Sequence, residues 1–146
     1  MKTTMNPLDS VTEWVEGVGH TYHTELYASL VLEEAKEMLE AMECPSLATE
    51  IRRTIGCLDG LSYSIRKEPD DLDAKPIELL DAALDLAWVS LCLAYTLVGD
   101  NLGPAWSELH RSNVVDKQVD GKFIKDSTGK VLKPASWKAP NLEQFL

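Results

Sequence analysis

Acidic side chains recur at helical spacing in two stretches of this sequence. The first string is Glu33, Glu34 and Glu37, and the second is Glu78, Asp81 and Asp85. At about 100° per helical residue, positions three or four apart lie on one face, so each string forms an acidic row. Apolar residues continue the same rows, Leu26 and Leu30 in the first and Trp88 and Cys92 in the second. Both helices are therefore predicted to point acids into a shared core.

Such a concentration of carboxylates requires neutralisation. At an effective dielectric near 20, two carboxylates about 5 Å apart repel by roughly 3 kcal/mol. Several such pairs offset much of a domain's usual stability of about 5–15 kcal/mol. Protonation is one remedy, and binding of Mg²⁺ or Mn²⁺, which prefer oxygen ligands, is the other. Carboxylates three or four residues apart on facing helices suit a metal held inside a helical bundle.

The rival interpretation is that the acids are solvated surface charges. The chain has a net charge of −10, with −13 on residues 1–109 and +3 on residues 110–146. A surface this acidic excludes nonspecific binding to duplex nucleic acid, which needs basic residues to neutralise phosphates. In this interpretation the protein is a noncatalytic acidic helical bundle that mimics DNA or binds a basic partner.

Composition indicates one soluble domain. The 146 residues are expected to form a single domain, with a helical core over about 10–115 and a hairpin and arm over about 116–146. No uninterrupted apolar run approaches the roughly 18 residues of a membrane span, and no signal-peptide segment follows Met1. We therefore expect no membrane partner and a cytoplasmic location, or the host cytoplasm if the chain is encoded by a phage.

Cysteine and histidine offer little metal chemistry. Cys44, Cys57 and Cys92 lack C-x-x-C spacing and are expected to be reduced, mostly buried thiols. His20 and His23 have no cysteine partners nearby and no H-E-x-x-H pattern. A structural zinc site is therefore not expected.

Helical patterns cover most of the chain, which predicts an all-α bundle of four or five helices. The S-x-x-E capping box at Ser10–Glu13 predicts the start of the first helix. Gly56 and Gly60 are expected to permit close approach of another helix, and Gly99 to cap the second acidic helix. The further predicted helices span residues 21–43, 47–67, 76–98 and about 104–115.

The basic C-terminal region has a different pattern. Residues 121–125 and 130–133 are predicted to form two short strands around a turn at 126–129. Trp137 and Pro140 follow in an extended arm. Because a two-stranded hairpin is marginal alone, we expect it to pack on the helices or on another subunit.

The acidic motifs and a later run of residues occur in a fixed order along the chain. The E-E-x-x-E of residues 33–37 is followed by the E-x-x-D of residues 78–81, and then by the run His110–Lys117. Gly129–Lys133, Trp137 and Pro140 follow. Together these motifs resemble the MazG-like all-α nucleoside triphosphate pyrophosphohydrolases of phages and bacteria, and the resemblance covers about residues 21–146. One departure is the segment between the acidic motifs, which is longer than in compact members of the family.

The resemblance implies hydrolysis of a (deoxy)nucleoside triphosphate to the monophosphate and pyrophosphate. It favours a purine nucleotide such as dGTP, with dUTP or dCTP as the alternative within the same fold. It also implies a homodimer or homotetramer whose sites lie near subunit interfaces.

The resemblance also assigns roles to individual residues. One or more Mg²⁺ or Mn²⁺ ions would be held by Glu34, Glu37, Glu78 and Asp81, while Asp85 would be a further ligand, a supporting acid or a partner for the tail lysines. Glu33 would act as general base. Lys117 would offset charge on the departing pyrophosphate, and Asn113 would bond to a phosphate or to the base. Trp14 or Trp106 would stack on the base, or belong to the core.

Overall fold

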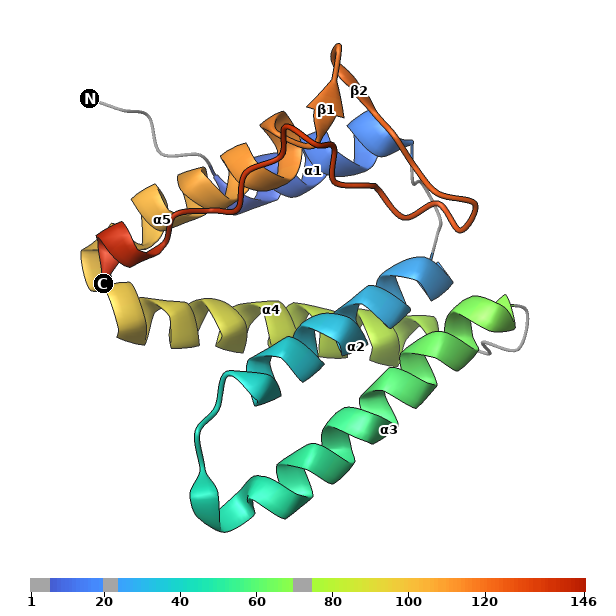
Figure 1. Ribbon diagram of the computed structural model, residues 1–146, viewed down its shortest axis with the longest axis vertical. Helices are drawn as coiled ribbons and strands as arrows, with labels where there is room; N and C mark the ends of the chain where they lie inside the picture. Colours follow the sequence, from blue (N-terminus) through green and yellow to red (C-terminus); the bar gives the residue numbers. More distant parts are fainter. Residues whose placement is uncertain (1–5, 20–23, 70–74) are drawn as a thin grey trace. The chain divides into compact units, whose positions relative to one another are not determined.

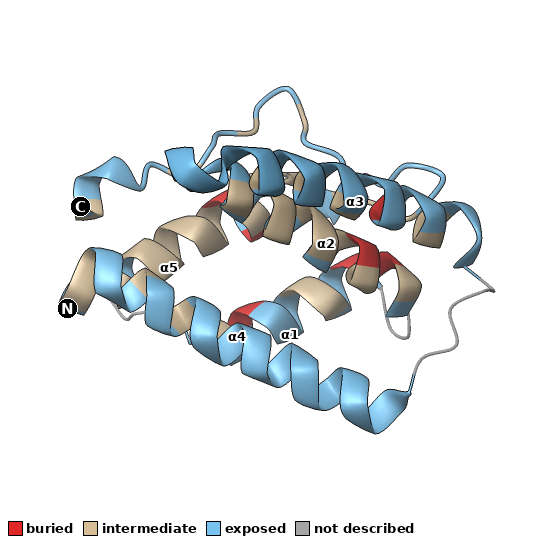
Figure 2. Cartoon of the chain, turned by 90° about the horizontal axis from the view of Figure 1, so that it is seen from below, coloured by how far each residue is buried: buried red, intermediate tan, exposed pale blue. Residues whose placement is uncertain are grey.

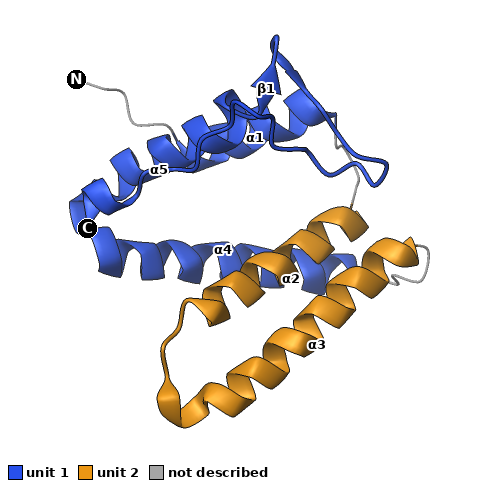
Figure 3. Cartoon of the chain, in the orientation of Figure 1, with its two compact units in different colours: residues 1–21, 75–146 blue, residues 22–74 orange. Residues whose placement is uncertain are grey.

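The structure is a computed structural model that describes residues 6–19, 24–69 and 75–146. It is all-α with a short C-terminal hairpin, as the sequence predicted (Figure 1). The helices are α1 (Pro7–Val18), α2 (Thr24–Glu40), α3 (Ala48–Lys67), α4 (Pro76–Val98) and α5 (Leu102–His110). The chain divides into two compact units, residues 22–74 and residues 1–21 with 75–146 (Figure 3). Assembly of the helices into one bundle, and one domain over residues 1–146, remain predictions.

The unit of residues 22–74 is the hairpin of α2 and α3, and a 3₁₀ turn at Pro45–Leu47 directly precedes α3. Two serines allow the helix axes to approach: Ser29 is 0% and Ser62 2% exposed, and the Ser62 Oγ donates to the Ser29 carbonyl at 3.1 Å. Gly56 and Gly60 do not form this contact with α2, because nothing among the described residues lies within 4 Å of a Cβ built at either position. Serine therefore provides the small residue between these helices that was expected to be glycine. Its hydroxyl can be buried because it donates a hydrogen bond to a helix carbonyl.

The other unit begins with α1, whose start differs from the prediction. Asn6 is the N-cap, since its side-chain oxygen accepts from the Leu8 amide at 3.0 Å and Pro7 occupies the first helical position. Ser10, predicted to be the cap, lies inside the helix and is 6% exposed. Its Oγ donates to the Asn6 carbonyl at 3.1 Å and accepts from the Trp106 indole at 3.1 Å, so Ser10 joins α1 to α5.

The end of α1 is fixed by the C-terminal region. The helix stops at Gly19, whose φ of 66° is left-handed, and the Lys125 ammonium donates to the Val18 carbonyl at 2.7 Å. Phe123 packs beside the same turn, with its ring centroid 5.1 Å from that of Trp14 in an edge-on contact. A Cβ built at Gly17 would lie 3.0 Å from the Phe123 ring. Glycine at this position therefore makes room for the aromatic side chain.

The hairpin forms earlier in the chain than predicted. Strands β1 (Gln118–Val119) and β2 (Lys122–Phe123) pair antiparallel across a two-residue turn. Asp120 and Gly121 both have positive φ, 52° and 73°, as this tight connection requires. The expected pairing of residues 121–125 with 130–133 is reduced to one isolated bridge, between Lys125 and Val131. The Asp-Gly dipeptide was the signal that the sequence analysis did not use.

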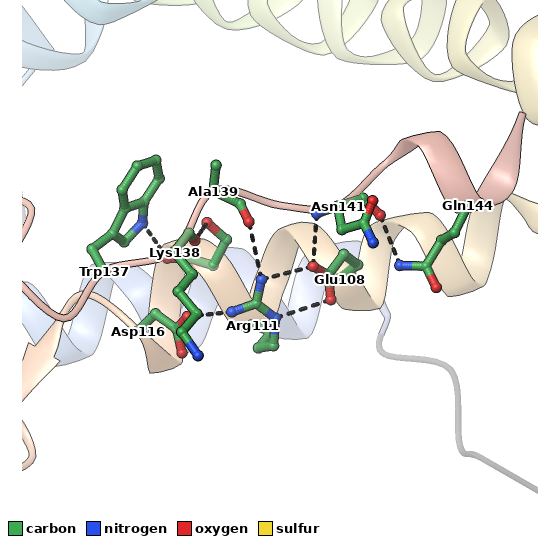
Figure 4. Close-up of polar contacts among 9 residues, drawn as sticks. Glu108, Arg111, Asp116, Trp137, Lys138, Ala139, Asn141 and Gln144 are labelled. Atoms are coloured by element: carbon green, nitrogen blue, oxygen red, sulfur yellow. Dashed lines mark hydrogen bonds and ion pairs between the residues drawn. The ribbon is translucent and has the colours of Figure 1, made fainter.

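The C-terminal arm packs on its own unit. It runs along α5 and its π-helical continuation η4 (Arg111–Val115) (Figure 4). The Trp137 indole donates to the Ser112 carbonyl at 2.9 Å, and the Ser112 Oγ donates to the Lys138 carbonyl at 2.8 Å. Ser112 is fully buried by these contacts. They anchor the chain end to the helical part of the unit.

The longest helix, α4, is exposed along most of its length (Figure 2). Trp88 is 73% and Ile77 80% exposed, and none of the residues of α4 is buried. The expectation of buried cysteines is also wrong: the three thiols are unpaired, but Cys92 on α4 and Cys57 on α3 are exposed, and Cys44 is half-buried. Its own unit therefore leaves large apolar side chains of this helix uncovered.

Candidate functional site

The first acidic row lies on α2. Glu33 is half-buried and its carboxylate pairs with the Arg66 guanidinium of α3 at 2.6 Å. Glu34 and Glu37 are exposed. The apolar part of the predicted row is confirmed at Leu26, which is 3% exposed. The row thus passes from a buried start at Leu26 to a solvated carboxylate at Glu37.

Basic side chains already neutralise part of this row. The Lys36 ammonium lies 3.0 Å from Asp59 of α3 and 3.8 Å from Glu40. The hydrogen bond and charge of Asp59 raise the pKa of Lys36 against the opposing effect of desolvation. From the sequence, neutralisation of the carboxylates was expected from protonation or from a bound metal alone. The structure shows that Lys36 and Arg66 also supply positive charge beside α2.

The second acidic row lies on α4. Glu78, Asp81 and Asp85 occupy the N-terminal half of the helix and all three are exposed. From residue 86 to residue 98 the helix carries no charged side chain. The carboxylates are therefore concentrated at one end of an otherwise apolar helix.

The donor chemistry of the two rows fits a hard divalent cation, which takes carboxylate oxygens and water. Within the described parts of the chain, no three His, Cys, Asp or Glu side chains gather closely enough to hold an ion. The two rows also belong to different units. A site with four or more carboxylates therefore needs α2 and α4 to face each other, and that pairing remains a prediction.

Two of the predicted substrate-binding residues come together in the unit of residues 1–21 and 75–146. The Lys117 ammonium lies 5.2 Å from the centroid of the Trp14 ring, within the range of a cation–π interaction. Both side chains are half-buried, and so is Asn113, on η4. Trp106, the alternative stacking residue, instead donates its indole N–H to Ser10. Trp14 is therefore the better candidate for contact with a base.

A cluster that the sequence analysis missed lies beside these residues. Arg111 donates to both carboxylate oxygens of Glu108, at 2.9 and 2.7 Å, and also pairs with Asp116 (Figure 4). The hydrogen bonds that Arg111 donates to Glu108, with the charges of both acids, raise the pKa of Arg111 above its usual range. The signal in the sequence was the i, i+3 spacing of Glu108 and Arg111. Because two acids already engage this guanidinium, we assign it to positioning the tail.

His110 has a contact that the sequence did not indicate. Its side chain is 9% exposed, and its Nε2 lies 3.5 Å from the Glu13 carboxylate of α1. Among the described residues, its buried Nδ1 has no hydrogen-bond partner. His110 thus joins α5 to α1. The other two histidines, His20 and His23, lie outside the described residues.

Comparison of this chain with protein-family models, with curated proteins and with solved structures finds no match. The resemblance drawn from the acidic motifs and the C-terminal run therefore stays a prediction.

Proposed function

We propose that this protein is a Mg²⁺- or Mn²⁺-dependent pyrophosphohydrolase that converts a (deoxy)nucleoside triphosphate to the monophosphate and pyrophosphate. The observation that supports it most is the pair of carboxylate rows at helical spacing in α2 and α4. Glu34, Glu37, Glu78 and Asp81, with Asp85 as a further candidate, would hold the ions. When bound, such ions offset phosphate charge and activate an attacking water.

The other proposed residues act on the substrate directly. Glu33 would accept a proton from the attacking water, and its pair with Arg66 would fix the direction of the carboxylate. Lys117 would stabilise negative charge on the departing pyrophosphate. Asn113 would hydrogen-bond to a phosphate or to the base, and Trp14 would stack on the base.

A hydrolysis screen tests the activity and the choice of base together. The full chain is incubated with each common ribo- and deoxynucleoside triphosphate and Mg²⁺ or Mn²⁺, and pyrophosphate is measured, with EDTA as control. We expect pyrophosphate release, favouring a purine nucleotide such as dGTP over dUTP and dCTP. Absence of turnover with every triphosphate and both metals would reject the proposal.

Variants of α2 test the residue roles. Replacing the proposed base, Glu33→Gln, is expected to lower kcat about 10²–10⁴-fold. Glu34→Gln and Glu37→Gln should weaken activation by Mg²⁺, so that more metal is needed for half-maximal rate. Glu50→Gln, an exposed acid in the first turn of α3, is the matched control and should leave both quantities unchanged.

The exposure of Glu34, Glu37, Glu78, Asp81 and Asp85 favours a second candidate, an acidic helical protein that binds a basic partner or mimics DNA. Thermal unfolding separates the two. Ligands that bind the native state raise the melting temperature as their concentration rises, so Mg²⁺ and Mn²⁺ should stabilise an enzyme and scarcely affect a mimic. In a mimic, Glu34→Ala and Glu37→Ala should also leave metal-free stability unchanged or higher.

A further inference from the structure

The helix that begins as α5 changes its hydrogen-bond register at Arg111. The Arg111 amide bonds to the carbonyls of Ser107 and Glu108, four and three residues earlier, as at an ordinary helix end. The Asp116 amide instead bonds to the Arg111 carbonyl, five residues earlier, at 2.9 Å, which makes η4 a π-helical turn. Single π turns are rare and frequently lie at functional sites. Specific contacts are therefore needed to favour this turn over the α-helical one.

A side-chain ion pair spans the same turn. The Arg111 guanidinium pairs with the carboxylate of Asp116, five positions later in the chain (Figure 4). In a continuous α-helix, positions five apart point about 140° away from each other, on nearly opposite sides of the axis. The ion pair therefore favours the i, i+5 register of η4 over the i, i+4 register of an α-helix.

The C-terminal arm supplies a hydrogen-bond donor that this turn requires. In an α-helix the Ser112 carbonyl would accept from the amide four residues on, which is that of Asp116. Here that amide bonds to Arg111, and the Ser112 carbonyl accepts from the Trp137 indole at 2.9 Å (Figure 4). Ser112 is 0% exposed, and a buried carbonyl without a donor destabilises the fold. The indole bond therefore offsets the loss of the α-helical one.

We infer that Trp137 is a positioning residue that acts through the Ser112 carbonyl. Its indole bond holds η4 in the i, i+5 register, and this register places Lys117 over the ring of Trp14, 5.2 Å from the centroid. A return to the α-helical register would turn the chain beyond Val115 by about 100° around the helix axis and carry Lys117 away from that ring. The control of the register is independent of the proposed function, whereas its effect on catalysis rests on that function.

Two bonds between the arm and Ser112 allow the role of the indole to be separated from simple docking of the arm. Trp137→Phe removes the donor to the Ser112 carbonyl but keeps an aromatic ring for the Lys133 ammonium, which lies 4.1 Å from the ring centroid. Ser112→Ala is the matched control. It removes the other bond, from the Ser112 Oγ to the Lys138 carbonyl at 2.8 Å, and leaves the Ser112 carbonyl and its indole donor in place.

NMR couplings across hydrogen bonds identify the carbonyl to which each amide bonds. In the native chain and in Ser112→Ala, the Asp116 amide should couple to the Arg111 carbonyl. In Trp137→Phe this coupling should disappear, and a coupling to the Ser112 carbonyl should replace it. A coupling to Arg111 that survives in Trp137→Phe would overturn the inference, and so would its equal loss in both variants, since the whole arm would then hold the turn. The native chain gives a test without any substitution, because coupling of Asp116 to Ser112 there would also reject the inference.

The side-chain protons of Lys117 report its position in the same spectra. Protons above an aromatic face are shifted upfield, so the Lys117 methylene signals should be upfield in the native chain and in Ser112→Ala. They should move toward their unshifted positions in Trp137→Phe. Unchanged Lys117 signals in a variant whose register has changed would show that the register does not place this lysine.

Hydrolysis rates test whether Trp137 acts on catalysis through Lys117. Trp137→Phe should lower kcat toward the value of Lys117→Met, by about 10²-fold, because it misplaces the same cation. The double variant should be no slower than Lys117→Met alone, since both substitutions remove one interaction. A double variant slowed by the product of the two single effects would overturn the link to Lys117. The couplings are measured without substrate or metal, so a chain that hydrolyses no triphosphate still tests the register, and failure of the register leaves the hydrolase proposal intact.

Discussion

The Lys117 ammonium lies 5.2 Å from the centroid of the Trp14 ring, which joins the turn after η4 to α1. A lysine over an aromatic face is attracted by the electrons of the ring, which favours one direction of its side chain. The ring of Trp14 also contacts Phe123, which fixes its orientation. A base and a triphosphate bound here would meet an aromatic surface and a cation from one unit.

Replacing that cation tests its role in the proposed reaction. Lys117→Met keeps most of the aliphatic chain over Trp14 and removes the charge. We expect kcat for triphosphate hydrolysis to fall about 10²-fold or more, as when one group that stabilises transition-state charge is removed. Lys122→Met, at an exposed position of β2, should leave kcat unchanged. Equal activity of the two variants would remove Lys117 from the mechanism.

Close packing of α2 on α3 depends on a small residue at position 62. Ser62 is 2% exposed and bonds to the Ser29 carbonyl. Ser62→Leu should force the helices apart and lower the free energy of unfolding by about 1–3 kcal/mol. Ser64→Leu introduces the same side chain two residues away, at an exposed position, and should cost much less. Chemical denaturation followed by circular dichroism measures both, and equal losses would contradict the packing argument.

The helices could be predicted from the sequence because apolar periodicity and end signals agree over long stretches. The predicted start at Pro76 and cap at Gly99 are those of α4. The start of α1 was misplaced because Ser10–Glu13 matches a capping box, while the Asn6-Pro7 pair supplies the actual cap and first helical residue. Both motifs signal a helix start and lie within a few residues of each other. Neither motif reveals tertiary hydrogen bonds such as that from Trp106 to Ser10.

The candidate site was less predictable than the fold. Helical spacing correctly placed the carboxylates in rows, but it carried no information on which cations lie opposite. Arg66 is 33 positions from Glu33, and Asp59 is 23 positions from Lys36, so both pairs depend on the α2–α3 hairpin. The contact of Lys117 with Trp14 likewise joins positions more than 100 residues apart. Such pairs follow from the fold, and no local pattern encodes them.

The C-terminal arm, residues 134–146, should detach when the Arg111 guanidinium that holds it is replaced. Arg111 binds Glu108 and Asp116 and donates to the Ala139 carbonyl at 3.3 Å, while Glu108 also accepts from the Asn141 amide at 2.9 Å. Arg111→Lys keeps the charge but loses the planar fork that serves several acceptors. We expect faster proteolysis within residues 134–146, with little change in helix content. Lys138→Arg, at an exposed position of the arm, is the control. Equal cleavage rates would show that Trp137 and the backbone bonds suffice.

The turn after β2 should loosen in acid because of Asp126. Its carboxylate accepts from the Thr128 hydroxyl at 2.7 Å and from the amides of Thr128 and Lys130 at 2.8 and 3.1 Å. These bonds, that from the Thr128 hydroxyl first, lower the pKa of Asp126 below its ordinary value. A carboxyl whose pKa is lower in the folded state stabilises that state above its unfolded pKa, about 3.9. The contribution is then lost as the pH falls through the lower, folded value.

Amide chemical shifts of Thr128 and Lys130, followed by NMR as the pH is lowered, measure this loss directly. In the native chain both amides should shift together as Asp126 is protonated. Asp126→Asn keeps an acceptor oxygen but no titrating group, so the two amides should lose this transition. Asp9→Asn, at an exposed position of α1, should leave it in place. A transition that persists in Asp126→Asn would mean that another acid controls the turn.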